Sequence, residues 1–166
     1  GSTITIQLAK NLFPRNDYGI FFYPVNKTRE AIIAYRIEKL YSKDEILELY
    51  LNTVSFGEDV YGVESAAKRF FNQKASTLAD EQAATLIGML KATTSYSPVL
   101  HPEAALQRRN TVLNQMVVNG SLEEPRYQEL KHKPLGTNYQ EAEDELAGYF
   151  MANLKTKLHA FIEDYN

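Results

Sequence analysis

The stretch TREAIIAYRIEKLYSKDEILELYLN, residues 28–52, decides the fold class. In its first half, apolar side chains recur every three or four residues, which is the spacing of one helix face: Ile33, Ala34, Ile37, Leu40 and Tyr41. Ser42 followed by Glu45 has the pattern of a capping box, in which two side chains satisfy backbone N–H groups at a helix start. The stretch therefore predicts one helix up to about residue 41 and a second from residue 43 to about residue 52.

The same helical spacing continues outward in both directions. Residues 13–26 contain Pro14, Gly19 and Pro24 and are expected to be irregular. A helix is expected at 3–12 with Ser2 as its N-cap, and a shorter helix is expected to end near Phe71. Another is expected at 78–91, capped by Thr77, and one from Pro102 to a stop at Gly120. The last two are expected at 124–131 and 143–163. Because no segment is convincing as a strand, the sequence predicts a single all-α domain over residues 1–166.

The composition is that of an ordinary globular domain, and it excludes several classes of protein. Of the 166 residues, 44% are hydrophobic and 23% are charged, and the formal net charge of −3 argues against nucleic-acid binding. The absence of cysteine excludes disulfides and zinc–thiolate sites, and the three histidines lack the spacing of a metal site. No apolar run approaches the roughly 20 residues of a transmembrane helix. We expect no protein-borne metal site and a membrane anchor, if one exists, outside this chain.

Glu30 carries a charge where the helix pattern requires an apolar residue. It lies three and seven positions before Ile33 and Ile37, so it points with them toward the interior. A carboxylate in that position must be paired, hydrogen-bonded or directed into a cleft. The pattern leaves two interpretations open, which are favourable placement at the helix dipole in the first turn and a functional cleft. Lys27 and Arg29 flank Glu30, and this cluster can hold an anion while Glu30 stays ionised.

Arg109 is the second charged residue that breaks the pattern. It shares a stripe with Ala105, Val112 and Leu113, so its guanidinium needs a partner in the interior. A buried arginine fixes helix packing more often than it contacts substrate. The pattern therefore favours a structural role for Arg109.

Several segments resemble, in order and spacing, the motifs of the peptidoglycan glycosyltransferases. That family includes monofunctional enzymes and the transferase domains of class A penicillin-binding proteins. The segments and the motifs are GSTITIQLAKN (1–11) with G-x-S-T-I-T-Q-Q-L-x-K-N, NKTRE (26–30) with R-K-x-x-E, KDEILELYLN (43–52) with K-x-x-I-L-E-x-Y-L-N, and the continuing segments FG (56–57), YGVESAA (61–67) and RRNTVL (108–113). The resemblance covers residues 1–117 and leaves a C-terminal helical part at 121–166.

The resemblance implies a lysozyme-like, all-α transferase domain at the outer (periplasmic or extracellular) face of a bacterial cytoplasmic membrane. The implied reaction polymerises lipid II: the 4-hydroxyl of an acceptor sugar attacks the anomeric carbon of a lipid-pyrophosphate-linked glycan, with inversion. This chemistry needs a base on the hydroxyl and cations on the leaving pyrophosphate. The implied partners are lipid II, the lipid-linked glycan strand, the membrane surface and phosphoglycolipid inhibitors of the moenomycin type. Magnesium or manganese is expected to accompany the pyrophosphate.

The resemblance also implies roles for particular residues. The donor-binding positions of the family fall on one helix face, at Gln7, Lys10 and Asn11. Lys10 is expected on the pyrophosphate, and Lys27 and Arg29 are expected to add positive charge there. Glu30 matches the second essential glutamate of the family, which is expected to organise those cations or a magnesium ion.

Other matching residues are expected to be mainly structural. Glu48, Tyr50 and Asn52 belong to the fourth motif, and Glu48 is the expected partner of a buried cation such as Arg109. Arg15 lies in a loop where some relatives place an arginine on the phosphates.

The sequence departs from the family pattern at three points. The first motif, E-D-x-x-F-x-x-H-x-G, carries the general base and has no match in residues 1–166, so we expect a partial domain that is inactive alone. Ile6 replaces a glutamine and Asn26 an arginine, which weakens a polar contact near Lys10 and removes a positive charge. Two alternatives stay open: a non-catalytic module that binds lipid-pyrophosphate or a phosphoglycolipid, and a lysozyme-like hydrolase, which would not need the cationic residues.

Overall fold

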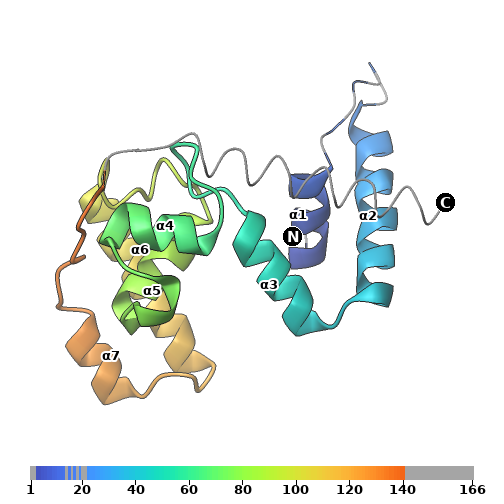
Figure 1. Cartoon of the computed structure of the whole chain (residues 1–166). Helices are drawn as coiled ribbons and strands as arrows, with labels where there is room; N and C mark the ends of the chain where they lie inside the picture. Colours follow the sequence, from blue (N-terminus) through green and yellow to red (C-terminus); the bar gives the residue numbers. More distant parts are fainter. Residues whose placement is uncertain (1–2, 14, 16, 18, 20–21, 141–166) are drawn as a thin grey trace. The chain divides into compact units, whose positions relative to one another are not determined.

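The computed structural model describes residues 3–13, 15, 17, 19 and 22–140, and these are predominantly helical (Figure 1). The helices are α1 (Ile4–Leu12), α2 (Phe22–Leu40), α3 (Lys43–Thr53), α4 (Val63–Phe71), the short 3₁₀ helix η2 (Ala75–Thr77), α5 (Asp80–Met89), α6 (Pro102–Val118) and α7 (Glu124–Leu130). Among the described residues the one β-type pairing is an isolated bridge between Ser55 and Tyr61. The expected all-α fold is confirmed for this part of the chain, and the helix expected at 143–163 lies outside it.

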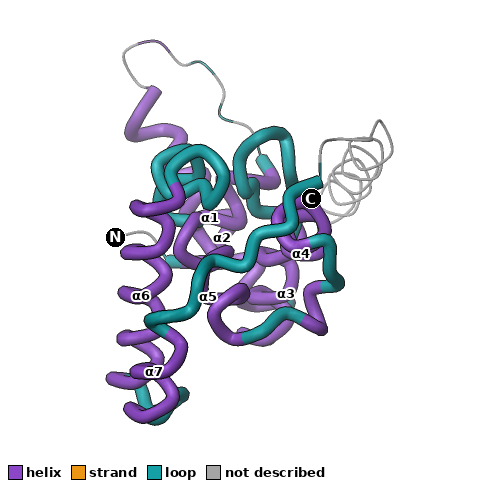
Figure 2. Tube along the Cα trace, turned by 90° about the vertical axis from the view of Figure 1, so that its left-hand side faces the viewer, coloured by secondary structure: helices purple, strands orange, loops and turns teal. Residues whose placement is uncertain are grey.

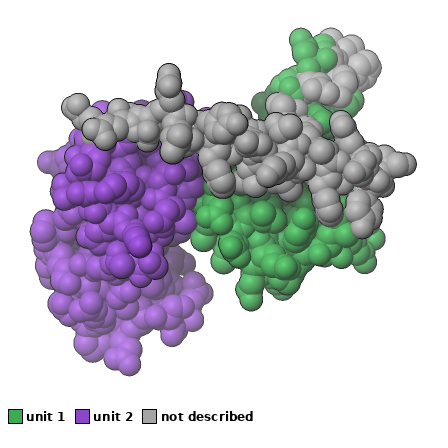
Figure 3. Space-filling model, viewed as in Figure 1, with its two compact units in different colours: residues 1–54, 145–166 green, residues 55–144 purple. Residues whose placement is uncertain are grey.

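The described residues fall into two compact units, unit 1 up to residue 54 and unit 2 from residue 55 onward (Figure 3). Unit 1 contains α1, α2 and α3, and α1 packs against both of the other helices. Its core draws on all three helices: Leu8, Leu12, Ala34, Ile37, Ile46 and Tyr50. The single domain expected over residues 1–166 stays a prediction.

The first two helices begin at residues other than those expected. Thr3, rather than Ser2, is the N-cap of α1, because its hydroxyl oxygen accepts a backbone N–H of the first turn at 3.2 Å. Helix α2 begins at Phe22, which is earlier than the sequence predicts, and it includes Pro24. Proline is tolerated in the first turn, where its missing N–H removes no helical hydrogen bond. The irregular stretch therefore ends sooner than expected.

Helix α3 begins as the sequence predicts. Ser42 Oγ accepts the backbone N–H of Glu45 at 3.3 Å, and a carboxylate oxygen of Glu45 accepts the backbone N–H of Ser42 at 2.7 Å. These bonds satisfy two donors that have no partner within the helix, and the hydrogen bond from the Ser42 backbone N–H lowers the pKa of Glu45. The capping box is confirmed.

Unit 2 contains the remaining helices, of which α5 and α6 pack closely together. Gly88 permits this approach, because a Cβ at that position would lie 3.1 Å from Cγ of Arg108. As expected, Pro102 opens α6 and Gly120, with φ of +74°, follows its end. The core of unit 2 is rich in large apolar side chains: Phe56, Phe70, Phe71, Leu86, Met89, Leu113 and Leu130.

Helix α5 begins at Asp80 rather than Leu78, because Thr77 ends the 3₁₀ helix η2 instead of capping α5. Residues 131–140 begin with a turn at the end of α7 and then cross unit 2 to α4 without regular secondary structure (Figure 2). None of the helices described is long and apolar enough to cross a membrane.

Candidate functional site

The candidate site begins with Glu30, whose side chain is buried on the inner face of α2. Glu30 is 4% exposed and shares this face with Asn26, Ala34 and Ile37. Because α2 begins at Phe22, Glu30 lies well beyond the first turn, and the helix dipole does not explain its position. The first-turn interpretation is therefore wrong, and the burial of Glu30 that the helix pattern predicts is confirmed.

Two cations meet the Glu30 carboxylate. Arg15, in the segment between α1 and α2, donates from Nε to Oε1 at 2.7 Å. Lys27, one turn earlier on α2, donates from Nζ to Oε2 at 3.2 Å. Each carboxylate oxygen thus has a charged donor, which is the condition for burying such a group without a large loss of stability. We call Arg15, Lys27 and Glu30 the Glu30 cluster.

These contacts fix the charge state of Glu30. The hydrogen bond from Arg15 holds the pKa of Glu30 below its ordinary value, with burial opposing this shift and Lys27 adding to it. The same hydrogen bond is the main reason why the pKa of Arg15 is raised. Glu30 is therefore ionised at neutral pH and is a poor proton acceptor there. In this arrangement its chemical capability is to hold two cations in fixed directions.

Arg15 is the residue of the cluster that sequence analysis located least well. Its guanidinium carbon lies 6.0 Å from the ring centroid of Tyr23, and its side chain is 24% exposed. No periodic spacing connects a loop residue with Glu30, so the sequence could place Arg15 only in the right loop. A chemical signal does point to it, since a buried carboxylate next to one lysine on its own helix still needs a second donor.

The expected donor-binding residues lie on α1. They share one helix face, opposite the buried side chains of Thr5, Leu8, Ala9 and Leu12, and they are Gln7, Lys10 and Asn11. Gln7 and Lys10 are exposed, and Asn11 is half-buried. In the described part of the chain, no hydrogen bond or ion pair joins Lys10 to the Glu30 cluster. Unit 1 therefore carries two neighbouring sets of polar residues on packed helices, one on α1 and one on α2.

Of the residues expected on α2, the structure joins Lys27 directly to Glu30. Arg29 is half-buried and immediately precedes Glu30 in the helix. Arg15 and Lys27 carry two positive charges against the one negative charge of Glu30, so the Glu30 cluster has a net positive charge. An arrangement of this kind can bind an anionic group.

Tyr50 from α3 supports the α1 face. Its side chain is buried, with 7% exposed, and its hydroxyl donates to Gln7 Oε1 at 3.2 Å. Burial raises the pKa of Tyr50, so the phenol stays protonated and can act as the donor. This contact agrees with the mainly structural role expected of the fourth motif.

Arg109 is fully buried in unit 2, as the helix pattern predicts, but its partners differ from those expected. Nε and Nη2 donate to Asn110 Oδ1 at 3.0 and 2.9 Å. The remaining N–H groups donate to the backbone carbonyls of Lys133 (2.8 Å), Pro134 (3.1 Å) and Lys131 (3.0 Å). All five guanidinium donors are thus occupied, and the expected pairing with the exposed Glu48 is wrong.

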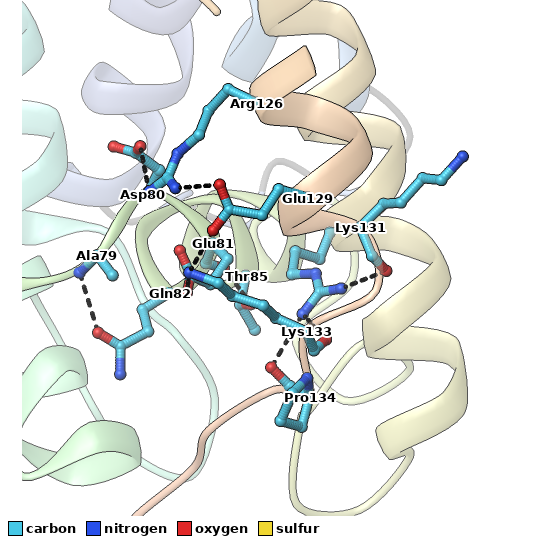
Figure 4. Close-up of polar contacts among 11 residues, drawn as sticks. Ala79, Asp80, Glu81, Gln82, Thr85, Arg126, Glu129, Lys131, Lys133 and Pro134 are labelled. Atoms are coloured by element: carbon cyan, nitrogen blue, oxygen red, sulfur yellow. Dashed lines mark hydrogen bonds and ion pairs between the residues drawn. The ribbon is translucent and has the colours of Figure 1, made fainter. Parts of the chain in front are cut away.

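Ion pairs connect α5 with α7 and with the segment that follows α7 (Figure 4). Arg126 contacts Asp80 and Glu129, at 3.9 and 2.6 Å, and Lys133 contacts Glu81 at 3.1 Å. The pairs that involve exposed side chains contribute little to stability. The buried carboxylate of Glu81 matters more, because its Oε2 has no hydrogen-bond partner among the described residues.

The described residues contain no group of three or more His, Asp or Glu side chains placed to hold a metal ion. In the Glu30 cluster both carboxylate oxygens accept hydrogen bonds from cations. Glu30 therefore does not fit the role of a metal ligand in this arrangement, and the charge of the site comes from its side chains.

The fold and the site define an all-α domain that organises cations around a buried carboxylate. Residues 1–117 match the transglycosylase family, and the chain belongs to that family. The match ends just after the segment that contains Arg109, so it includes all described residues of unit 1 and part of unit 2.

Several relatives are penicillin-binding proteins. Penicillin-binding protein 1A of Aquifex aeolicus is 41% identical over 156 residues, which are 94% of this chain and 21% of that protein. Penicillin-binding protein 1F of Bacillus subtilis is 45% identical over 116 residues, which are 70% of this chain and 16% of that protein. The chain thus spans about a fifth of the length of these relatives.

The fold is shared with a solved structure. The crystal structure of penicillin-binding protein 1A from Haemophilus influenzae aligns with a TM-score of 0.56 at 21% identity. The alignment covers 92% of this chain and 19% of that one. This likeness concerns the fold, while family membership rests on the sequence match.

Proposed function

We propose that this domain is a peptidoglycan glycosyltransferase. Such an enzyme polymerises lipid II into β-1,4-linked glycan strands and releases undecaprenyl pyrophosphate during bacterial cell-wall synthesis. The observation that carries the proposal is the Glu30 cluster, which lies at the family's R-K-x-x-E motif and holds Lys27 and Arg15 in fixed directions. Membership of the transglycosylase family supports the same reaction.

In this reaction the 4-hydroxyl oxygen of the acceptor sugar bonds to the anomeric carbon of the donor. The hydroxyl proton passes to a base, the bond from that carbon to the pyrophosphate oxygen breaks, and its electron pair leaves with the pyrophosphate. Negative charge grows on the leaving group, so cations fixed beside it lower the barrier. Lys10, Lys27 and Arg29 are the residues we assign to that task, and Glu30 is the carboxylate that orients Lys27.

The partners follow from this chemistry. We propose lipid II and a lipid-linked glycan strand as substrates, at the outer face of a bacterial cytoplasmic membrane. A phosphoglycolipid inhibitor of the moenomycin type would occupy the same cationic residues through its phosphate. Magnesium or manganese is proposed to accompany the donor pyrophosphate rather than the protein, because both Glu30 oxygens are already engaged.

The polypeptide of residues 1–166 by itself is expected to bind lipid II without polymerising it. Glu30 is held by two cations, and no segment matches the motif that supplies the family's general base. Loss of a general base lowers a rate by roughly 100- to 10,000-fold. The measurement is incubation with labelled lipid II and magnesium in detergent, with glycan polymer followed by gel.

The matched comparison is a polypeptide in which E-D-x-x-F-x-x-H-x-G precedes residue 1. Equal rates of polymer formation by the two polypeptides would place the base within residues 1–166 and contradict our assignment. If neither polypeptide makes polymer while both bind lipid II, the non-catalytic binding module replaces the enzyme as the proposed function.

Lys10→Ala is expected to weaken binding of lipid II or a phosphoglycolipid about 10- to 100-fold, which corresponds to the ~1.5–3 kcal/mol of a charged hydrogen bond. The reason is that Lys10 is exposed on the α1 face and is assigned to the pyrophosphate. Titration calorimetry at fixed ionic strength measures the Kd. Lys39→Ala, at an exposed lysine in the last turn of α2, is the control for a general loss of positive charge. Equal Kd values for wild type and Lys10→Ala remove Lys10 from the site.

A further inference from the structure

A short loop in unit 2 holds backbone conformations that L-amino acids rarely adopt. Gly57, Glu58 and Asp59 follow one another with φ of +85°, +53° and +58°. Glycine suits the first position, since a Cβ there would lie 3.2 Å from Cβ of Thr93. Glu58 and Asp59 carry the steric strain that left-handed backbone imposes on residues with a Cβ. Such conformations persist only where the surrounding structure holds them.

Hydrogen bonds within the loop do not reach the strained side chains. The backbone N–H of Phe56 donates to the carbonyl of Val60, and that of Val60 donates to the carbonyl of Gly57, each at 2.8 Å. A contact from outside the loop does reach Glu58, because the hydroxyl of Tyr139 donates to Glu58 Oε2 at 2.6 Å.

Tyr139 belongs to the segment 131–140, which we call the strap (Figure 2). The backbone N–H groups of Asn138 and Gln140 donate to the carbonyls of Phe70 and Arg69, at 2.9 and 2.8 Å. These are two of the last carbonyls of α4, which have no donor within their own helix. The strap therefore completes the C-terminal end of α4.

Side chains reinforce this attachment. The rings of Phe70 and Tyr139 lie 6.0 Å apart between centroids, and the Arg69 guanidinium carbon lies 5.8 Å from the Tyr139 ring. Arg69 Nη1 also donates to the carbonyl of Gln140 at 3.2 Å. The Tyr139 ring is thus held in place, so its hydroxyl is presented to Glu58 in a fixed direction.

The strap is anchored at its other end by Arg109. The buried guanidinium donates to the carbonyls of Lys131, Lys133 and Pro134, between 2.8 and 3.1 Å. Both ends of the segment are therefore fixed to helices of unit 2, one end to α6 and the other to α4.

We propose that the strap keeps the loop 57–59 in its left-handed conformation. The contact through which it acts is the Tyr139–Glu58 hydrogen bond, which we call the latch. The loop lies between the FG and YG segments at 56–57 and 61–62, and Arg109 belongs to the RRNTVL segment. The strap thereby connects two motif segments that are far apart in the sequence. The inference rests on contacts within unit 2 and does not depend on the proposed enzymatic function.

Amide hydrogen exchange tests the proposal. Tyr139→Phe keeps the ring but removes the hydroxyl, so we expect exchange at Phe56 and Val60, whose N–H groups close the loop, to accelerate roughly tenfold. Exchange at Leu113, in the core of unit 2, should change less than about twofold, because the latch acts locally. Tyr127→Phe, the same chemical change on α7, serves as the matched control and should leave Phe56 and Val60 unaffected.

The Glu58→Gly variant distinguishes a local effect of the Tyr139–Glu58 hydrogen bond from a general effect on the stability of unit 2. Glu58→Gly removes the carboxylate and also relieves the backbone strain, so Tyr139→Phe should then have no further effect at Val60. Unchanged exchange at Phe56 and Val60 in Tyr139→Phe overturns the proposal. Equal acceleration at Leu113, or an undiminished effect in the Glu58→Gly background, overturns it as well, because the hydroxyl would then act elsewhere than on Glu58.

Discussion

Glu30→Gln is expected to lower the rate of lipid II polymerisation at least about 100-fold, the loss typical of removing one preorganised charged group. Glutamine keeps the size of the side chain but not its charge, so Arg15 and Lys27 lose the carboxylate that fixes their directions. The fold should survive the substitution, because the side chains of Arg15 and Lys27 are 24% and 50% exposed and can be hydrated instead. The expected effect is therefore on the rate and not on the amount of folded protein.

The assay requires a polypeptide in which the first family motif precedes residue 1, together with thermal unfolding to show that the variant is folded. Glu38→Gln is the matched control, because it removes the same charge from an exposed position on the same helix. Near-normal turnover in Glu30→Gln would reduce Glu30 to a buried charge that serves packing alone. A rate loss shared equally by Glu38→Gln would point to overall charge rather than to the Glu30 cluster.

Helix boundaries could be predicted from the sequence where local chemistry decides them. Ser42, Pro102 and Gly120 mark helix ends through their own backbone or side-chain chemistry, and the structure places helix ends there. The start of α2 could not be predicted in this way. Asn26 Nδ2 and Thr28 Oγ1 donate to the carbonyls of Phe22 and Pro24 one turn earlier in the same helix, and Asn26 is buried. The apolar pattern contains none of these polar contacts, which accompany the extension of the helix through Pro24.

In the candidate site, too, some features could be predicted from the sequence and others could not. Periodicity is sufficient to place Glu30 and Arg109 inside, because burial follows from which face of a helix a residue occupies. Their partners come from segments whose path the helix pattern does not contain. Arg15 lies in a loop, and the acceptors of Arg109 include backbone carbonyls of the strap. Every residue has such a carbonyl, so residue identity does not mark which carbonyls accept these hydrogen bonds. The expectation of a Glu48–Arg109 pair failed because it considered side chains only.

Arg109→Ala is expected to destabilise the folded protein by about 3–5 kcal/mol, the range measured when one partner of a buried charged group is removed. The substitution leaves the carbonyls of Lys133 and Pro134 and Asn110 Oδ1 without their donor, while the Lys131 carbonyl keeps a hydrogen bond from Asn110 Nδ2 at 3.3 Å. It also opens a cavity at a fully buried position. Burial lowers the pKa of Arg109 while the charge of Glu81 opposes that shift, so the change also removes a favourable charge from beside a buried carboxylate. For a chain of this size the expected loss corresponds to a decrease in Tm of roughly 6–20 °C.

Thermal and urea unfolding of the 166-residue chain measure this loss, with Arg108→Ala as the matched control. The neighbouring arginine is half-buried, makes one longer hydrogen bond, from Nε to the Gly88 carbonyl at 3.4 Å, and has its guanidinium carbon 5.9 Å from the Tyr96 ring centroid. Its removal should therefore cost about 1–2 kcal/mol, less than the removal of Arg109. Arg109→Lys should remain close to Arg109→Ala in stability, because a single ammonium cannot replace the fixed fork of five donors. If Arg109→Ala unfolds at the wild-type temperature while polymerisation in the longer polypeptide is lost, Arg109 acts on the reaction and its structural role is contradicted. If Arg108→Ala is equally damaging, the stability resides in the α5–α6 contact rather than in the anchoring of the strap.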